Sequence, residues 1–238
     1  MNDSPNATPR RDFLGQMAAS ALVLAGSACA APAAAAQAMS GAPTPGQNRA
    51  TAWDDSWFGR LTAKHKAVFD SPEFDEGNIL GPGHATRYIN GVRDALGVPI
   101  TDVQTVVVIR HKAIPFAFND AMWEKYAIGE DLKIKGEDDK WATRNPFAGP
   151  RGGGARQGAT DRPQANAVWL SSHGHIFLGC ALATQGYAGK IAERTKGSSN
   201  EIFEELKANL VPGMILQPNG VYAVLRAQEA GCAFMRST

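Results

Sequence analysis

The sequence predicts a three-layer α/β/α domain with a mostly parallel, five-stranded sheet. Short apolar runs that suit strands alternate with amphipathic segments that suit helices, from residue 66 to the end of the chain. The run 103–109 contains four consecutive β-branched residues, Val106 to Ile109, which is typical of a strand covered on both faces. Because helical crossovers return the chain to the same end of the sheet, consecutive strands should run parallel.

Five segments are predicted to be strands, since each is short, apolar and bounded by residues that favour turns. They are 66–70, 103–109, 176–183, 214–216 and 232–235. Five segments are predicted to be helices, on the basis of apolar spacing, capping residues or closing glycines. They are 85–96, a helix capped by Asn119 that runs through Tyr126 with Gly129 at its end, 165–172, 200–210, and a helix from Asn219 or Gly220 through Ala230.

The N-terminus has the pattern of a twin-arginine signal peptide. Arg10 and Arg11 precede Phe-Leu and a weakly apolar, alanine-rich stretch, with small residues for cleavage near Ala36 to Ala38. We therefore expect a signal peptide over 1–38, recognition by the twin-arginine export machinery, and a periplasmic mature protein with no stable membrane span. An uncleaved anchor, or a lipid on Cys29, is the alternative interpretation.

Beyond the leader, the sequence predicts a flexible lead-in over 39–60 and one domain over 61–238. A polar, glycine-rich loop at 130–163 interrupts that domain and is long enough to be either functional or mobile. The formal net charge is only +1, with acidic and basic residues spread along the chain, so nucleic acid is not an expected partner.

The mature chain would carry two cysteines, Cys180 and Cys232. The first should lie at the carboxyl end of its strand and the second at the amino end of the last strand, so both thiols are expected to be free. In open parallel sheets, clefts form beyond the carboxyl ends of the strands. Cys180 is therefore the candidate catalytic residue, although a buried structural cysteine is the alternative.

The candidate substrate-binding residues also follow predicted strands. Arg110, His111 and Lys112 come after the second strand, and Asn219 comes after the fourth. Basic groups beside a thiol favour its thiolate form, and helix N-termini add partial positive charge on the same side.

Other chemistry has weaker support in the sequence. His173 and His175 precede the third strand, at the opposite end from His111, so no metal site is predicted. The glycine run at 149–154 lacks the Lys-Ser/Thr ending of a phosphate loop, and no G-x-S-x-G motif surrounds the serines. No cofactor is predicted.

The order of these elements resembles the DsrE/DsrF-like family, and within it the exported branch with twin-arginine leaders. The segments that carry the resemblance are KAVFD, TVVVIRH followed by AFNDAMWEKYAIGE, IFLGCALA, and VPGMILQPNGVYAVLRAQEAGC. The resemblance spans about residues 64–236 and implies a small α/β domain that forms homo-oligomers and handles sulfur as a cysteine persulfide. Cys180 falls where the family's cysteine at the end of the third strand usually lies. The export leader and the long loop depart from the family's best-understood members.

The first hypothesis is therefore that Cys180, in a pocket rimmed by His111 and Asn219, binds or carries a small sulfur species. The alternative is a non-catalytic small-molecule-binding or oligomeric assembly module in which Cys180 is structural. A redox or metal enzyme that is exported already folded is a third possibility.

Overall fold

The computed structural model describes residues 53–75, 77–136, 138–149 and 163–238. All of them belong to one compact unit, Ala50–Thr238. The expected signal peptide, residues 39–52 of the expected lead-in, and residues 150–162 of the loop lie outside the described residues.

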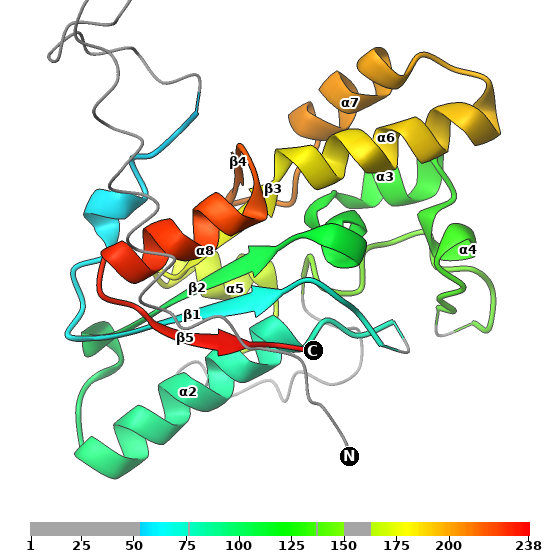
Figure 1. Ribbon diagram of the computed structural model, residues 1–238. Coiled ribbons are helices and arrows are strands. Elements are labelled where there is room, and N and C mark those ends of the chain that lie inside the picture. Colours follow the sequence, from blue (N-terminus) through cyan, green and yellow to red (C-terminus); the bar gives the residue numbers. More distant parts are fainter. Residues whose placement is uncertain (1–52, 76, 137, 150–162) are drawn as a thin grey trace, which may run out of the picture. The chain divides into compact units, whose positions relative to one another are not determined.

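The sheet has five strands, all parallel, in the order β4-β3-β2-β1-β5 (Figure 1). The strands are β1 (His65–Ser71), β2 (Val103–Ile109), β3 (Ile176–Cys180), β4 (Met214–Gln217) and β5 (Ala233–Arg236). The predicted fold class is thus confirmed. The last strand of the chain pairs with the first, so β5 forms one edge of the sheet beside β1.

The helices that connect and cover these strands are α2 (Leu80–Leu96), α3 (Asp120–Lys125), α4 (Ile128–Asp131), α5 (Ala167–Ser172), α6 (Ala181–Thr195), α7 (Ser199–Ala208) and α8 (Gly220–Glu229). Three short 3-10 helices are η1 (Phe58–Arg60), η2 (Ile100–Asp102) and η3 (His111–Ala117). Several helices begin where a side chain accepts a hydrogen bond from the first turn. The capping residues are Asn119, Asn166, Cys180, Ser198 and Asn219.

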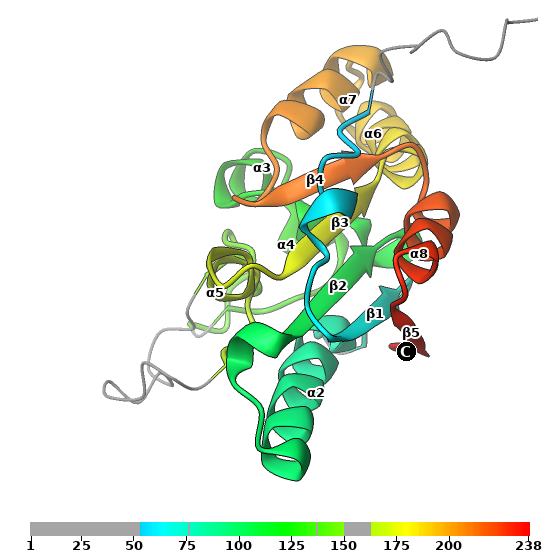
Figure 2. The ribbon, with the colours of Figure 1, turned by 90° about the vertical axis from the view of Figure 1, so that its left-hand side faces the viewer.

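Two apolar cores make the three layers. Val107 and Ile109 belong to the core that contains residues of α2 and α6. Val106 and Val108, which point to the other face because side chains alternate along a strand, belong to the core that contains residues of α8. Figures 1 and 2 show α2 and α8 on opposite sides of the sheet. The unbroken apolar run of β2 is explained by this double burial.

Helix α6 was not predicted from the sequence. The third strand was expected to continue to Ala183, but it ends at Cys180 and the helix starts at Ala181. The apolar run Ala181 to Ala183 continues the strand pattern, and Gly186 and Gly189 weaken the helical pattern that follows.

The folded part also begins earlier than expected, and the loop is partly packed. Trp57, in the expected lead-in, is fully buried in the core beneath α8. In the expected loop, Asn145 is buried and donates hydrogen bonds to the carbonyl oxygens of Phe116 and Phe118. Gly129 was expected to end a helix but lies within α4, where its backbone closely approaches Ala142.

Candidate functional site

The carboxyl ends of the strands form a rim that contains several of the predicted residues. Cys180, the last residue of β3, is in register with Gln217, the last residue of β4. On the other side, Gly179 is in register with Ile109, so Arg110 directly follows the neighbouring strand. Cys180 therefore lies between the segments that carry Arg110 and Asn219, as the sequence predicted.

Cys180 has two roles in the backbone, because it ends β3 and caps α6. Its Sγ accepts a hydrogen bond from the backbone N–H of Ala183 at 3.3 Å. Only 6% of its surface is exposed, and it belongs to the core that contains α6. The sulfur thus lies at the N-terminus of a fifteen-residue helix, which is the positive end of the helix dipole.

Arg110 places a second positive charge near this sulfur. Its Nε donates to Asp70 Oδ1 at 2.6 Å and its Nη2 to Asp70 Oδ2 at 2.7 Å. The pKa of Arg110 is raised, first by the hydrogen bonding to Asp70, and further by attraction to the charges of Asp70 and of a Cys180 thiolate.

The N-terminus of α8 holds Arg110 in place. A Cβ added at Gly220 would lie 2.4 Å from Cδ of Arg110, so only glycine leaves room for the arginine stem. Asn219 caps this helix through Oδ1, which accepts the N–H of Tyr222 at 2.8 Å. The backbone N–H of Leu182 donates to the carbonyl of Pro218 at 3.3 Å, which joins the start of α6 to the segment before α8.

His111 and Lys112 contact Glu73 instead of Cys180. His111 Nδ1 lies 3.3 Å from Glu73 Oε1, and Lys112 Nζ lies 3.1 Å from Glu73 Oε2. Both basic side chains are more than half exposed, and the pKa of Glu73 is lowered, chiefly by the hydrogen bond from Lys112. His111 and Lys112, at the start of η3, thus contact Glu73 on the segment between β1 and α2, rather than forming the expected rim around the sulfur.

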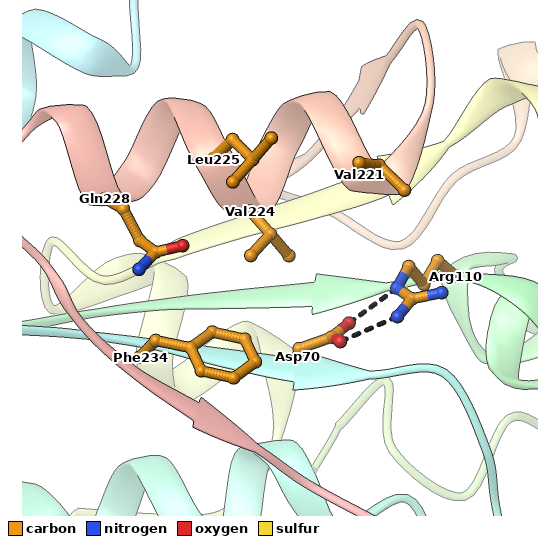
Figure 3. Close-up of a pocket in the computed structure, with 7 residues that line it drawn as sticks. All are labelled: Asp70, Arg110, Val221, Val224, Leu225, Gln228 and Phe234. Carbon is orange, nitrogen blue, oxygen red and sulfur yellow. Dashed lines mark hydrogen bonds and ion pairs between the residues drawn. The ribbon is translucent and has the colours of Figure 1, made fainter. Parts of the chain in front are cut away.

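A groove of about 210 Å³ lies next to Arg110, between α8 and the β1–β5 edge (Figure 3). Its lining residues are Asp70, Arg110, Val221, Val224, Leu225, Gln228 and Phe234. Figure 3 shows the Asp70–Arg110 pair at one end of the groove and Gln228 toward the other, with apolar side chains between them. Cys180 does not line this groove. Arg110 lines the groove and also follows the strand that neighbours β3, which ends at Cys180.

Sequence reasoning missed Asp70, which fixes Arg110. The sequence nevertheless contained an indication of this role. Asp70 lies near the carboxyl end of the first predicted strand, at the rim where the basic residues were expected. The pairing of β1 with β2 brings Asp70 beside Val108, two residues before Arg110.

The second cysteine lies apart from the rim, as predicted. Cys232 precedes β5 at its amino end, and both Cys180 and Cys232 are free and buried. Burial raises the pKa of Cys232 to about 11, against an opposing effect of Lys66. Such a thiol stays protonated at neutral pH, so Cys180 is the better candidate for chemistry.

Within the part of the chain that the structure describes, no cluster of three or more His, Cys, Asp or Glu side chains is arranged to hold a metal ion. None of the helices described there is both long and apolar enough to cross a bilayer.

Comparison with known proteins adds little to this geometry. No family model matches the chain, and no curated protein matches it. Among solved structures, the chain is similar to the protein of unknown function MTH1491 from Methanobacterium thermoautotrophicum. That match has a TM-score of 0.33 and 14% sequence identity, and it covers 72% of this chain and 98% of the other.

Proposed function

We propose that this chain is a DsrE-like sulfur carrier whose working group is the thiol of Cys180. The observation that carries the proposal is the surroundings of the sulfur, which accepts the Ala183 N–H at the start of α6 and lies on the rim where Arg110 follows the neighbouring strand. The thiolate is the nucleophilic form of a cysteine, and reactive cysteines commonly lie at helix N-termini or beside basic groups. Asn219 caps the neighbouring helix on the same rim.

The chemistry is a pair of thiol exchanges. The Cys180 thiolate attacks the outer sulfur of a donor persulfide, so that a new S–S bond forms at Cys180 while the donor's S–S bond breaks and the donor leaves as a thiolate. An acceptor thiolate then attacks the outer sulfur on Cys180 and releases the Cys180 thiolate. One sulfur atom moves in each exchange, and no outside oxidant or reductant is consumed.

The proposal is tested by intact mass spectrometry of the protein purified under native conditions, and again after exposure to a persulfide donor. We expect an adduct of one sulfur atom on the wild type and on Cys232→Ser, and none on Cys180→Ser. A reducing agent should remove the adduct. Wild-type protein that stays unmodified after exposure to the donor, or an adduct that survives in Cys180→Ser, would refute the assignment.

A second candidate function is supported by the burial of Cys180. With 6% of its surface exposed and core residues around it, the cysteine could act only in packing. The protein would then be a binding or assembly module, and its thiol would react no faster with a neutral alkylating reagent than the buried Cys232. The relative alkylation rates of the two cysteines therefore separate the two functions.

Export belongs to the same proposal and is supported by the sequence of the leader. If Arg10 and Arg11 direct the chain to the twin-arginine machinery, the double substitution Arg10→Lys and Arg11→Lys in the full chain should keep the uncleaved precursor in the cytoplasm. Cell fractionation followed by mass analysis of the N-terminus measures this. Unchanged export of the doubly substituted chain would contradict it.

A further inference from the structure

Among the residues that the structure describes, no strand pairs with the outer edge of β5. β5 is an edge strand of the sheet, and all four of its residues are exposed. Phe234 and Met235 are 49% and 46% exposed, an unusual state for large apolar side chains in a strand. Exposed edge strands are normally blunted or covered, because their unpaired backbone groups attract other strands.

The pairing of β5 with β1 determines which backbone N–H and C=O groups of β5 face the outer edge. The N–H of Ser237 donates to the carbonyl of Asp70 in β1 at 2.7 Å. Since alternate residues of a strand direct their N–H and C=O to the same side, Ala233 and Met235 also face β1. The N–H and C=O groups of Phe234 and Arg236 must then point to the outer edge.

We infer that a second copy of this chain covers this edge, with β5 paired antiparallel to its counterpart about a twofold axis at Met235. In this register Phe234 faces Arg236 of the partner subunit, and Arg236 faces Phe234 of the partner subunit. All four outward N–H and C=O groups of each strand are then hydrogen-bonded. A closed twofold dimer of this kind leaves neither β5 edge exposed.

The side chains favour this register over its neighbours. Arg236 would lie beside the aromatic ring of Phe234 across the interface, a pair that a cation–π interaction stabilises. An axis at Arg236 would instead oppose two like charges directly, and an axis at Phe234 would leave Arg236 facing the buried Cys232. The strand is thus complementary to itself in one register.

The neighbouring surface fits the same partner. A twofold axis perpendicular to the sheet keeps both α8 helices on one side of the joined sheet. Phe234 lies on that side, where it lines the groove with Val221 and Leu225, which are themselves more than half exposed. The dimer would therefore shield an apolar surface that extends beyond the strands, as specific interfaces of adequate size require.

Sedimentation velocity over a range of concentrations tests the dimer on protein purified after expression of the full chain. We expect the wild type to be a dimer and Met235→Lys to be a monomer with an unchanged circular dichroism spectrum, because the substitution places two ammonium groups opposite each other. Leu96→Lys, which changes an exposed leucine at the end of α2, is the matched control and should remain a dimer. A monomeric or trimeric wild type, or a dimer that survives Met235→Lys, overturns the inference.

Disulfide trapping tests the register itself. Residues directly opposite in a non-hydrogen-bonded antiparallel pair have Cβ atoms about 4.5–5.5 Å apart, close enough for a bridge after a small adjustment. Met235→Cys should therefore form a covalent dimer on mild oxidation, whereas Leu96→Cys and Phe234→Cys should not. Cross-linking of Met235→Cys no faster than that of Leu96→Cys would exclude this register.

Discussion

The hydroxyl of Ser71 lies so close to Gly81 that a Cβ added at Gly81 would come within 2.0 Å of Ser71 Oγ. Val107 Cγ1 would lie 3.0 Å from the same added atom. The first turn of α2 therefore packs directly on the end of β1, and glycine is required at this point for lack of space. At Gly91, in the same helix, an added Cβ would have no heavy atom within 4 Å beyond its chain neighbours and the backbone of its own helix.

These two glycines should respond in opposite ways to the same substitution. Gly91→Ala should raise the free energy of unfolding by about 0.5–1 kcal/mol, because alanine loses less backbone entropy in a helix. Gly81→Ala should lower it by about 1–3 kcal/mol, the usual cost of overpacking. Urea denaturation of both variants measures the contrast, and Ser71→Ala combined with Gly81→Ala should recover part of the loss. Equal effects at the two positions would contradict the close packing.

The ion pair of Asp70 with Arg110 should contribute measurably to stability. Asp70→Asn removes a charged acceptor whose side chain is only 5% exposed, and it should cost about 2 kcal/mol, the range for hydrogen bonds to charged groups. Asp94→Asn, at an exposed position of α2, is the control and should change the free energy of unfolding by no more than about 0.5 kcal/mol. A loss at Asp70 no larger than that at Asp94 would mean that the pair contributes little.

Arg110 should also affect the reactivity of Cys180. Arg110→Gln removes the positive charge near the sulfur, so a neutral reagent should alkylate Cys180 several-fold more slowly at neutral pH. Arg144→Gln, which changes an exposed arginine paired with Asp120, should leave that rate unchanged. Peptide mapping after timed alkylation gives the rate at each cysteine. An unaltered rate in Arg110→Gln would remove the electrostatic support for the proposed function.

His175 should make the protein less stable in mild acid. Its Nδ1 accepts the backbone N–H of Thr105 at 3.1 Å, and burial, together with the charge of His173, lowers its pKa from 6.5 to about 4. The unfolded chain therefore takes up the proton first as the pH falls. The stability that neutral His175 contributes is complete above about pH 6.5 and is lost progressively down to pH 4, by about 3 kcal/mol in total.

Denaturation curves between pH 7 and pH 4 measure this loss. His175→Asn keeps an acceptor for Thr105 without an ionisable group, so its stability should vary less with pH over that window. His173→Asn, which changes an exposed histidine, should retain most of the slope. A slope in His175→Asn equal to that of the wild type would assign the acid sensitivity to other groups.

The sequence predicted the sheet well because its strands are buried on both faces. The unbroken apolar run of β2 has no helical interpretation at that length, and Gly97 ends α2 in the left-handed conformation that its position suggested. The start of α2 was placed five residues too late, at Ala85. Gly81 and Pro82 resemble a turn in isolation, yet proline is tolerated in the first turn of a helix, where its missing N–H has no intrahelical partner.

The candidate site was predicted in part. The ends of β2 and β3 placed Arg110 and Cys180 on one rim correctly, since parallel strands share their carboxyl edge. The directions of His111 and Lys112 could not be predicted, because His111 adopts a positive φ of 53° that turns the chain into η3. That turn brings both side chains to Glu73, a contact that depends on the tertiary position of the segment between β1 and α2.

The pairing of the last strand with the first has a consequence for how the protein matures. Until Ala233–Arg236 have left the ribosome, β1 lacks one neighbour, so the five-stranded sheet cannot close while only β1 to β4 are available. The emergence of Ala233–Arg236, rather than of any earlier segment, therefore sets the moment at which the complete sheet can form.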